Sequence, residues 1–271
     1  MSEQDLTRIS QVVSQDLQMG DKFTFECTDR CMGMCCQRIT IHLDPWDVKT
    51  MARYLEMPGK DFLDEFCGFE TVPGSWWPVV WLKHARNGPC VFLNQDGKCV
   101  LYPHRSRNCR SFPVGRAVRV SYQGDTPEIE ERYFMIKRMH YCLGHEGARE
   151  WTVGEWLDKS EVHTHNEMCD LYIELVSYVD QKLNGRAWMS PATAKMITPI
   201  LYGPDMLRAK LSITEKQVSH EEFYRRRIKA LREILTDMAA HLGFGPRAGK
   251  PDEDGLTVME KIKRILTTGV K

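Results

Sequence analysis

The chain has 271 residues, 42% of them hydrophobic, and its 37 Lys and Arg residues balance 37 Asp and Glu residues. This length is sufficient for one or two packed domains. A formal net charge of zero gives no global basic field, so no nucleic-acid partner is expected. The chain lacks an apolar run of the roughly 18 residues that a transmembrane helix needs, so no membrane insertion is expected.

Residues 1–22 are polar and mixed in charge, without the basic start and apolar stretch of a signal peptide. We therefore expect a cytoplasmic protein with reduced thiols. The spacing of the apolar residues predicts an amphipathic lead-in helix over this segment. These residues are Leu6, Ile9, Val12, Val13 and Leu17.

Residues 23–147 combine alternating segments with short helical ones, which predicts a small α+β domain. Asp44 and Pro45 predict the start of a helix that stops at Pro58 and Gly59. A second short helix is expected over 61–69, whereas 129–139 fits either a strand or a helix. The predicted strands are 23–27, 38–43, 76–82, 117–122 and a hairpin of 90–93 with 99–102 around an Asp-Gly turn.

Residues 148–271 have mainly helical spacing. Helices are predicted over 152–162, 166–185, 221–244 and 258–266, with a polar linker at 246–255. A stripe of Leu171, Leu175, Val179 and Leu183 marks the apolar face of the second of these helices. The predicted fold class is therefore α+β, a small cysteine-rich metal-binding domain with short strands and a hairpin, followed by a mainly helical C-terminal region.

Eight of the ten cysteines form a spaced array between residues 27 and 142. Thiolates are soft, anionic ligands that suit zinc and iron–sulfur clusters. In a cytosolic chain of this size such an array favours metal binding over disulfides. The predicted metal ligands are Cys27, Cys31, Cys35, Cys36, Cys90, Cys99, Cys109 and Cys142.

The other two cysteines, Cys67 and Cys169, lie among apolar residues and are predicted to be packed core thiols. The metal is left open between an iron–sulfur cluster, which we prefer, and zinc. None of the eight array cysteines forms the C-x2-C knuckle of ordinary zinc sites. Nearby aromatic residues could shield an iron–sulfur cluster. They are Trp76, Trp77, Trp81, Tyr102 and Phe112.

Arginines and histidines accompany the array. The arginines either stabilise an anionic metal site or form a solvated face. The histidines fit surface or supporting positions better than ligand positions. These residues are Arg30, Arg38, Arg105, Arg107, Arg110 and Arg116, with His104, His140 and His145.

The cysteine pattern resembles a known family. The order is C-x3-C-x3-C-C, then GPC-x-FL-x3-GKC-x-LY, then C-R-x-F-P, and a late Cys-x-Gly. It is similar to the YkgJ-type cysteine-cluster proteins, described as zinc- or iron-chelating, over roughly residues 23–147. Flagellin lysine N-methylase carries a related domain, so the resemblance also implies methyl transfer as an activity. The family has an Arg-Pro pair where this chain has Arg105 and Ser106, which predicts a small change in loop geometry.

Three functions follow from these observations. The first is a metal-binding protein of unassigned role. The second is a cluster-dependent enzyme, for example with protein lysine N-methyltransferase-like activity. The third is a zinc-stapled module whose helical half binds a protein partner. The sequence contains no G-x-G-x-x-G, Walker loop, nucleophile elbow or H-E-x-x-H, so whether the protein is an enzyme stays open.

Overall fold

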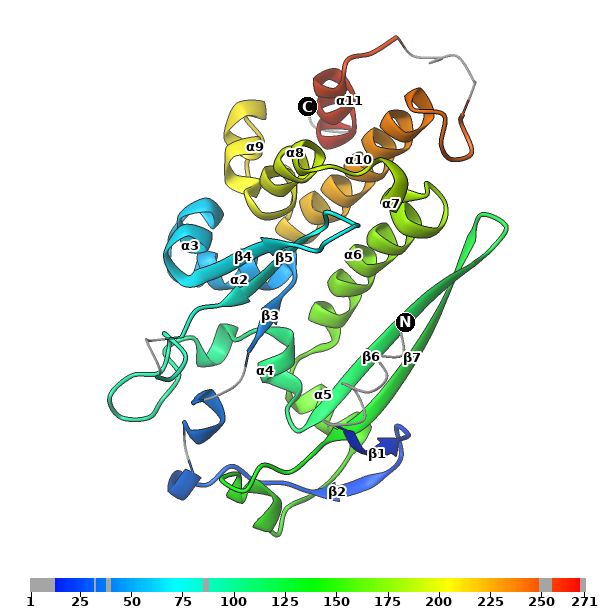
Figure 1. Ribbon diagram of the computed structural model, residues 1–271. Helices are drawn as coiled ribbons and strands as arrows, with labels where there is room; N and C mark the ends of the chain where they lie inside the picture. Colours follow the sequence, from blue (N-terminus) through cyan, green and yellow to red (C-terminus); the bar gives the residue numbers. More distant parts are fainter. Residues whose placement is uncertain (1–12, 32, 38–39, 85–87, 249–254, 269–271) are drawn as a thin grey trace. The chain divides into compact units, whose positions relative to one another are not determined.

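The computed structural model describes residues 13–31, 33–37, 40–84, 88–248 and 255–268 (Figure 1). Its fold is α+β, as predicted, with short strands gathered in the N-terminal half and helices following them. The strands are β1 (Val13–Leu17), β2 (Lys22–Thr24), β3 (His42–Leu43), β4 (Cys67–Thr71), β5 (Pro78–Leu82), β6 (Val114–Gln123), β7 (Thr126–Ile136) and β8 (Glu150–Thr152).

Helices make up most of the C-terminal half. The α-helices are α2 (Pro45–Tyr54), α3 (Gly59–Phe66), α4 (Arg107–Ser111), α5 (Val153–Lys159), α6 (His163–Gln181), α7 (Gly185–Trp188), α8 (Pro191–Tyr202), α9 (Pro204–Leu211), α10 (His220–His241) and α11 (Val258–Thr267). Four short 3-10 helices are η1 (Asp29–Cys31), η2 (Met34–Cys36), η3 (Tyr102–His104) and η4 (Leu143–Glu146).

The chain divides into two compact units. Unit 1 comprises Met1–His42, Leu82–Arg119 and Ile129–Asn166. Unit 2 comprises Leu43–Trp81, Val120–Glu128 and Glu167–Lys271. The units interleave along the chain, whereas the predicted domains (1–22, 23–147 and 148–271) are consecutive segments. Those domains stay a prediction.

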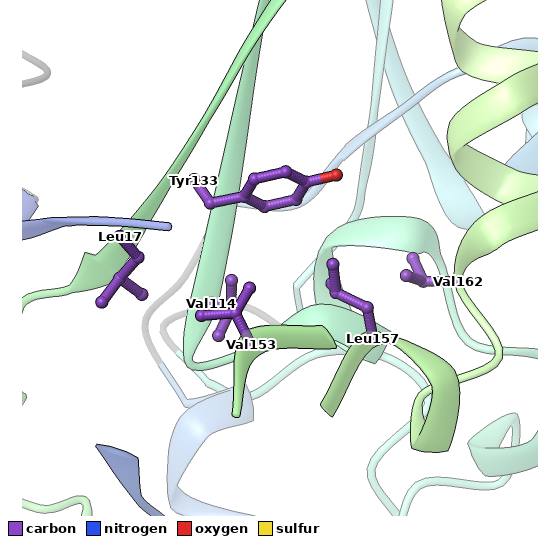
Figure 2. Packing of buried hydrophobic residues seen from close by; sticks show 6 residues of the cluster. All are labelled: Leu17, Val114, Tyr133, Val153, Leu157 and Val162. Atoms are coloured by element: carbon purple, nitrogen blue, oxygen red, sulfur yellow. The ribbon is translucent and has the colours of Figure 1, made fainter. Parts of the chain in front are cut away.

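Unit 1 is built on a sheet with the strand order β1-β7-β6, in which β1 runs antiparallel to β7. Six buried residues form its apolar core, drawn in Figure 2: Leu17, Val114, Tyr133, Val153, Leu157 and Val162. Two of them, Val153 and Leu157, belong to α5, whose start is fixed by a capping box between Thr152 and Glu155. The core thus joins three strands to one short helix.

Unit 2 is mainly helical, and its core centres on α10. Leu231, Leu235 and Ala239 of this helix are fully buried, and α10 packs against α8 and α11. Arg227 is also buried, and its Nη1 donates hydrogen bonds to the carbonyls of Ile200 and Leu201, at 2.7 and 2.8 Å. The guanidinium thus donates to two carbonyls in the last turn of α8, where the helix itself provides no backbone N–H partners.

The local signals for helices are confirmed. Helix α2 begins as predicted, with Pro45 in its first turn and Asp44 accepting hydrogen bonds from the backbone N–H groups of Trp46 and Asp47. The helices α5, α6, α10 and α11 fall within or next to their predicted ranges. On α6, Leu175 and Val179 are buried as the stripe predicts, but Leu171 is only half-buried.

Several predicted elements differ from the structure. In the described part of the lead-in segment the expected helix is wrong, because Val13–Leu17 pairs with β7 as a strand; residues 1–12 lie outside the described residues. The second short helix ends at Phe66, and Cys67 begins β4 instead. The ambiguous segment 129–139 is strand over most of its length, because β7 has a neighbour on each side.

Other strands are shorter or shifted. The strand expected at 23–27 is found at Lys22–Thr24, and that at 38–43 is described only at His42–Leu43. Strand β5 matches its prediction, although only alternate residues of it are buried. No described helix combines the length and apolar character needed to cross a membrane.

Candidate metal centre

All eight array cysteines belong to unit 1. The first four lie in and around η1 and η2, as expected for a loop with short helical turns. Gly33 adopts a left-handed φ of 79°, and a Cβ on it would lie 2.6 Å from the carbonyl oxygen of Gly97. A glycine is needed here, both for the backbone angle and for the close approach of the two cysteine-bearing loops.

The second loop carries Cys90 and Cys99. Its turn is held by the Asn94 side chain, which accepts hydrogen bonds from the N–H groups of Asp96 and Lys98 at 3.1 and 2.8 Å. The two arms of the predicted hairpin pair only over a short stretch and form no full strands: Leu93 and Cys99 make an isolated antiparallel bridge, and the N–H of Val100 donates to the carbonyl of Phe92 at 2.9 Å. The N–H of Cys90 donates to the carbonyl of Cys36 at 2.8 Å, which ties the two loops together.

Cys109 lies on the short helix α4. Ser106 caps this helix, its hydroxyl accepting from the N–H of Cys109 at 3.5 Å. The next residue, Arg110, is buried and forms a clamp. Its guanidinium donates to the carbonyls of Arg105 (3.0 Å), Ser160 (3.3 Å) and Pro103. Arg110 therefore fixes the path of the backbone between η3 and α4.

Cys142 follows β7 and occupies the position directly before η4. The N–H of Glu26, next to Cys27, donates to the carbonyl of Gly144 at 2.9 Å. The Phe25 ring lies directly on Gly144, where a Cβ would approach it to 2.6 Å. The Phe25 ring also packs edge-on against Phe112, with centroids 5.8 Å apart. These contacts bring the last array cysteine to the first.

Electrostatic interactions connect the eight thiols into one network centred on Cys35. The charge of Cys35 acts on six other array thiols, which are Cys27, Cys31, Cys36, Cys90, Cys99 and Cys142. Cys109 joins through its action on Cys36. No disulfide links the described cysteines. Cys27 and Cys142 are far apart in the sequence, yet the array thiols lie close enough to influence one another electrostatically.

The adjacent pair Cys35 and Cys36 is strongly polarised. A hydrogen bond with the Cys36 thiol is the main influence that lowers the pKa of Cys35 to about 6, and Arg105 adds to it. The same hydrogen bond, followed by burial, raises the pKa of Cys36 well above its ordinary value. Cys35 is thus the thiolate of the pair, and Cys36 is its donor.

Most other array thiols favour the protonated form. Burial is the largest cause that raises the pKa of Cys27, Cys90, Cys99 and Cys142, and neighbouring thiolates add to it. Cys31 is the exception. Burial acts to raise its pKa, but hydrogen bonds from the Thr28 hydroxyl and from the backbone at Leu143 and Thr28 outweigh it and lower the pKa. Without a cation the array would therefore hold few thiolates.

Arg105 is the arginine that acts on the largest number of array thiols. Its charge lowers the pKa of Cys27, Cys35 and Cys99, and its guanidinium stacks 4.0 Å from the centroid of the Tyr102 ring. Among the other arginines, Arg116 and Arg30 pair with Glu131 and Glu146 at 2.7 and 4.0 Å; Arg38 lies outside the described residues. Arg138 acts in the same direction on Cys142, so two arginines favour the thiolates, and Arg116 and Arg30 form ion pairs.

His145 is the histidine most enclosed by the site. Its Nε2 is buried and has no hydrogen-bond partner among the described residues, and its ring packs on Phe25 with centroids 5.1 Å apart. Burial, followed by the charge of Arg138, lowers the pKa of His145, which keeps the imidazole neutral. His140 instead packs against Tyr141 at 5.1 Å, and His104 is exposed.

The two remaining cysteines belong to unit 2. Cys67 and Cys169 are both buried, as predicted for packed thiols. Among the described residues, no three Cys, His, Asp or Glu side chains lie close enough to hold a metal ion as they stand. The assignment of the eight array cysteines as metal ligands therefore stays a prediction.

The comparison with protein families agrees with this chemistry. The family CxxCxxCC, described as a "Putative zinc- or iron-chelating domain", matches residues 26–170, which is more than half of the chain. The chain belongs to this family, and the predicted cysteine-cluster resemblance is confirmed. No curated protein and no solved structure matches the chain.

Proposed function

We propose that the cysteine array of unit 1 binds a metal centre, an iron–sulfur cluster in preference to zinc. The observation that carries this proposal is the network around Cys35, which connects thiols from four separate segments of the chain. A set of soft, ionisable sulfur donors fits both zinc and iron. Membership of a zinc- or iron-chelating family supports the same conclusion.

Two further features support iron–sulfur chemistry. Eight thiols exceed the four that one structural zinc ion takes, and the array lacks C-x2-C knuckles. A thiolate-held cluster is anionic and is tuned by nearby cations and by exclusion of solvent. Arg105 provides the cation, and the pair of Phe25 and Phe112 provides apolar cover beside Cys27 and Cys109. A reducing, cytoplasmic environment would keep these thiols available.

Anaerobic purification followed by metal, sulfide and visible-absorption analysis tests the proposal. A brown protein with iron and acid-labile sulfide is expected. A colourless protein with stoichiometric zinc would overturn the preference for iron but keep the metal centre. A protein that holds neither metal, even after reconstitution, would overturn the proposal.

Variants locate the site. Cys35→Ser should lower the metal content sharply, because the charge of Cys35 acts on more array thiols than that of any other array cysteine. Cys169→Ser is the matched control, since this thiol is buried on α6 in unit 2, and it should leave the metal content unchanged. Equal losses in both variants would contradict the assignment of the metal to the array.

A further inference from the structure

Unit 2 contains a pocket lined by titratable side chains that play no part in metal binding. The pocket has a volume of about 350 Å³, which is within the range of small-molecule sites. Its walls come from α2, the start of α3, α9 and the segment that leads into α10. The lining residues that carry the argument are Lys49, Arg53, Gly59, Asp205, Glu215 and His220.

Lys49 is the unusual member of this group. The residue is only 7% exposed, although it lines the pocket. Its amine makes no hydrogen bond or ion pair with any residue that the structure describes. A buried ammonium without a partner destabilises the folded state. Solubility, the usual role of a surface lysine, therefore does not explain a lysine in this position.

The neighbouring carboxylates already have other partners. Glu215 lies 2.6 Å from Nε2 of His220 and 3.6 Å from Nη2 of Arg53. Asp205 accepts a hydrogen bond from the N–H of Gly59 at 2.9 Å. Neither carboxylate therefore forms an ion pair with the amine of Lys49.

The charges that face Lys49 come from every element around it. Arg53 on α2 and Arg208 on α9 oppose its protonation, whereas Glu215 and Asp205 favour it. Burial is the largest influence, followed by Arg53, and together they lower the pKa of Lys49 to about 7. Burial, followed by the charge of Lys49, lowers the pKa of His220 to about 4. At neutral pH the pocket thus contains a neutral imidazole and an amine of which about half is neutral and available as a nucleophile.

We propose that this pocket binds a small aldehyde or ketone and that Lys49 forms a reversible imine with its carbonyl carbon. The lone pair of Nζ attacks this carbon, and the new C–N bond gives a carbinolamine after a proton passes from nitrogen to oxygen. Loss of one water molecule then gives the C=N bond, and no oxidant or reductant is needed. Arg53, Glu56 and Asp205 at the exposed part of the pocket would meet polar substituents of the ligand.

Reductive trapping on the full-length protein tests this proposal. The protein is treated with acetaldehyde and cyanoborohydride at pH 7, and the rate of N-ethylation is followed at each lysine by peptide mass spectrometry. Lys49 should react on the order of tenfold faster than Lys195, an exposed lysine of α8, because the lowered pKa of Lys49 leaves much of its amine neutral at pH 7. Trapping at Lys49 that is no faster than at Lys195 would overturn the proposal.

Two rim variants, both at exposed residues, identify the pocket as the cause. Arg53→Gln removes a repelling cation, so it should raise the pKa of Lys49 and slow its trapping at pH 7. Glu215→Gln removes an attracting anion and should lower that pKa, so that rapid trapping extends to lower pH. Unchanged Lys49 profiles in both variants would show that the pocket charges do not control the amine and would overturn the proposal. Lys195→Met is the control and should leave trapping at Lys49 unaltered.

Discussion

The two units of this chain differ in how far apolar side chains bury their central residues, which are those of α10 in unit 2 and the array cysteines in unit 1. In unit 2 the centre of α10 is fully buried by apolar side chains, including Leu231 and Leu235. In unit 1 the six-residue apolar core lies between β1, β6, β7 and α5, and the cysteine loops are not part of it. Cys27 and Cys35 are exposed as whole residues, although their thiols are partly buried, and Val91 and Val100 beside Cys90 and Cys99 are exposed as well.

This difference indicates two sources of stability. Apolar packing is sufficient to explain unit 2 and the sheet of unit 1. The cysteine loops have turns, a few backbone hydrogen bonds, one buried arginine and a small number of buried apolar side chains, among them Phe92 and Leu101. A metal bound by their thiols would supply what packing does not, because metal binding to such a site is coupled to its folding.

Removal of the metal should have the largest effect and should separate the two regions. Stripping the metal under reducing conditions should loosen residues 27–36 and 88–111, because structural zinc contributes on the order of 10 kcal/mol to the folding of small sites. Helix α10 should keep its protection, since the side chains at the centre of its buried face are mainly apolar. Hydrogen exchange of the apo and metal-loaded proteins measures both. Unchanged protection of the cysteine loops in the apo protein would mean that the site is preformed without metal.

A cavity in the core of unit 2 should have the opposite effect to metal removal: it should destabilise unit 2 and leave the cysteine loops unchanged. Leu235→Ala removes a fully buried side chain of α10, so it should lower the free energy of unfolding by about 2–5 kcal/mol. Leu242→Ala is the matched control, because this leucine is 56% exposed and its loss should cost about 0.5 kcal/mol or less. Denaturant unfolding monitored by circular dichroism measures the difference. Metal content should be normal in both variants, and a loss in Leu235→Ala would contradict the separation of the two regions.

The sequence predicts the elements whose signals are local. The cap at Asp44 and Pro45 defines the start of α2, and the apolar spacing of α10 defines that helix. Strand β1 could not be predicted in this way, because its pairing with β7 links residues more than 100 positions apart and overrides the helical spacing of Val13 and Leu17. Helix α8 was not predicted, since Pro199 inside it is a signal against helix.

The candidate sites also divide into features with a local sequence signal and features that depend on contacts between distant residues. The cysteine array is visible in the sequence because its residue type is rare and its spacing is distinctive. The polarised pair at Cys35 and Cys36 and the clamp of Arg110 depend on contacts between loops, so the sequence does not reveal them. The Lys49 pocket has no sequence signal: this lysine lies in an ordinary amphipathic helix, and residues 205–220 bury it only in the folded chain.

Lys49 should make the stability of unit 2 depend on pH. Its pKa is about 7 in the folded protein, below the ordinary value of 10.5. Between these values the unfolded chain holds a proton that the folded chain lacks, so the free energy of unfolding should rise with pH, by up to about 1.4 kcal/mol per pH unit. Below pH 7 both forms are protonated, and the folded protein bears the full cost of a buried ammonium.

Lys49→Met isolates this effect from other titrating groups. The variant should be more stable than the natural protein at pH 6, by on the order of 1–3 kcal/mol, and the difference should shrink as the pH approaches 10. Urea unfolding at several pH values gives the two curves. A difference that is constant over this range would show that the amine does not titrate with folding. Lys195→Met, at an exposed site of the same unit, should show no pH-dependent difference.

The smallest effect is expected at Ser106, where the resemblance to the YkgJ-type proteins implies a proline. The backbone already suits an Arg-Pro pair: Arg105 has φ −62° and ψ 155°, and Ser106 has φ −58°, which are angles that proline and its predecessor adopt. The substitution of serine for proline therefore does not require the change in loop geometry that the sequence predicts.

What serine adds is the cap of α4, whose hydrogen bond of 3.5 Å is long. Ser106→Ala should thus cost about 0.5–1 kcal/mol. Ser106→Pro loses the same cap but restricts the unfolded chain, which offsets about 0.4–1 kcal/mol, so its stability should stay close to that of the natural protein. Thermal unfolding of the metal-loaded variants measures both. A proline variant that is much less stable than the alanine variant would show that the fully buried Ser106 site cannot accept the ring, and that this loop follows a path of its own within the family.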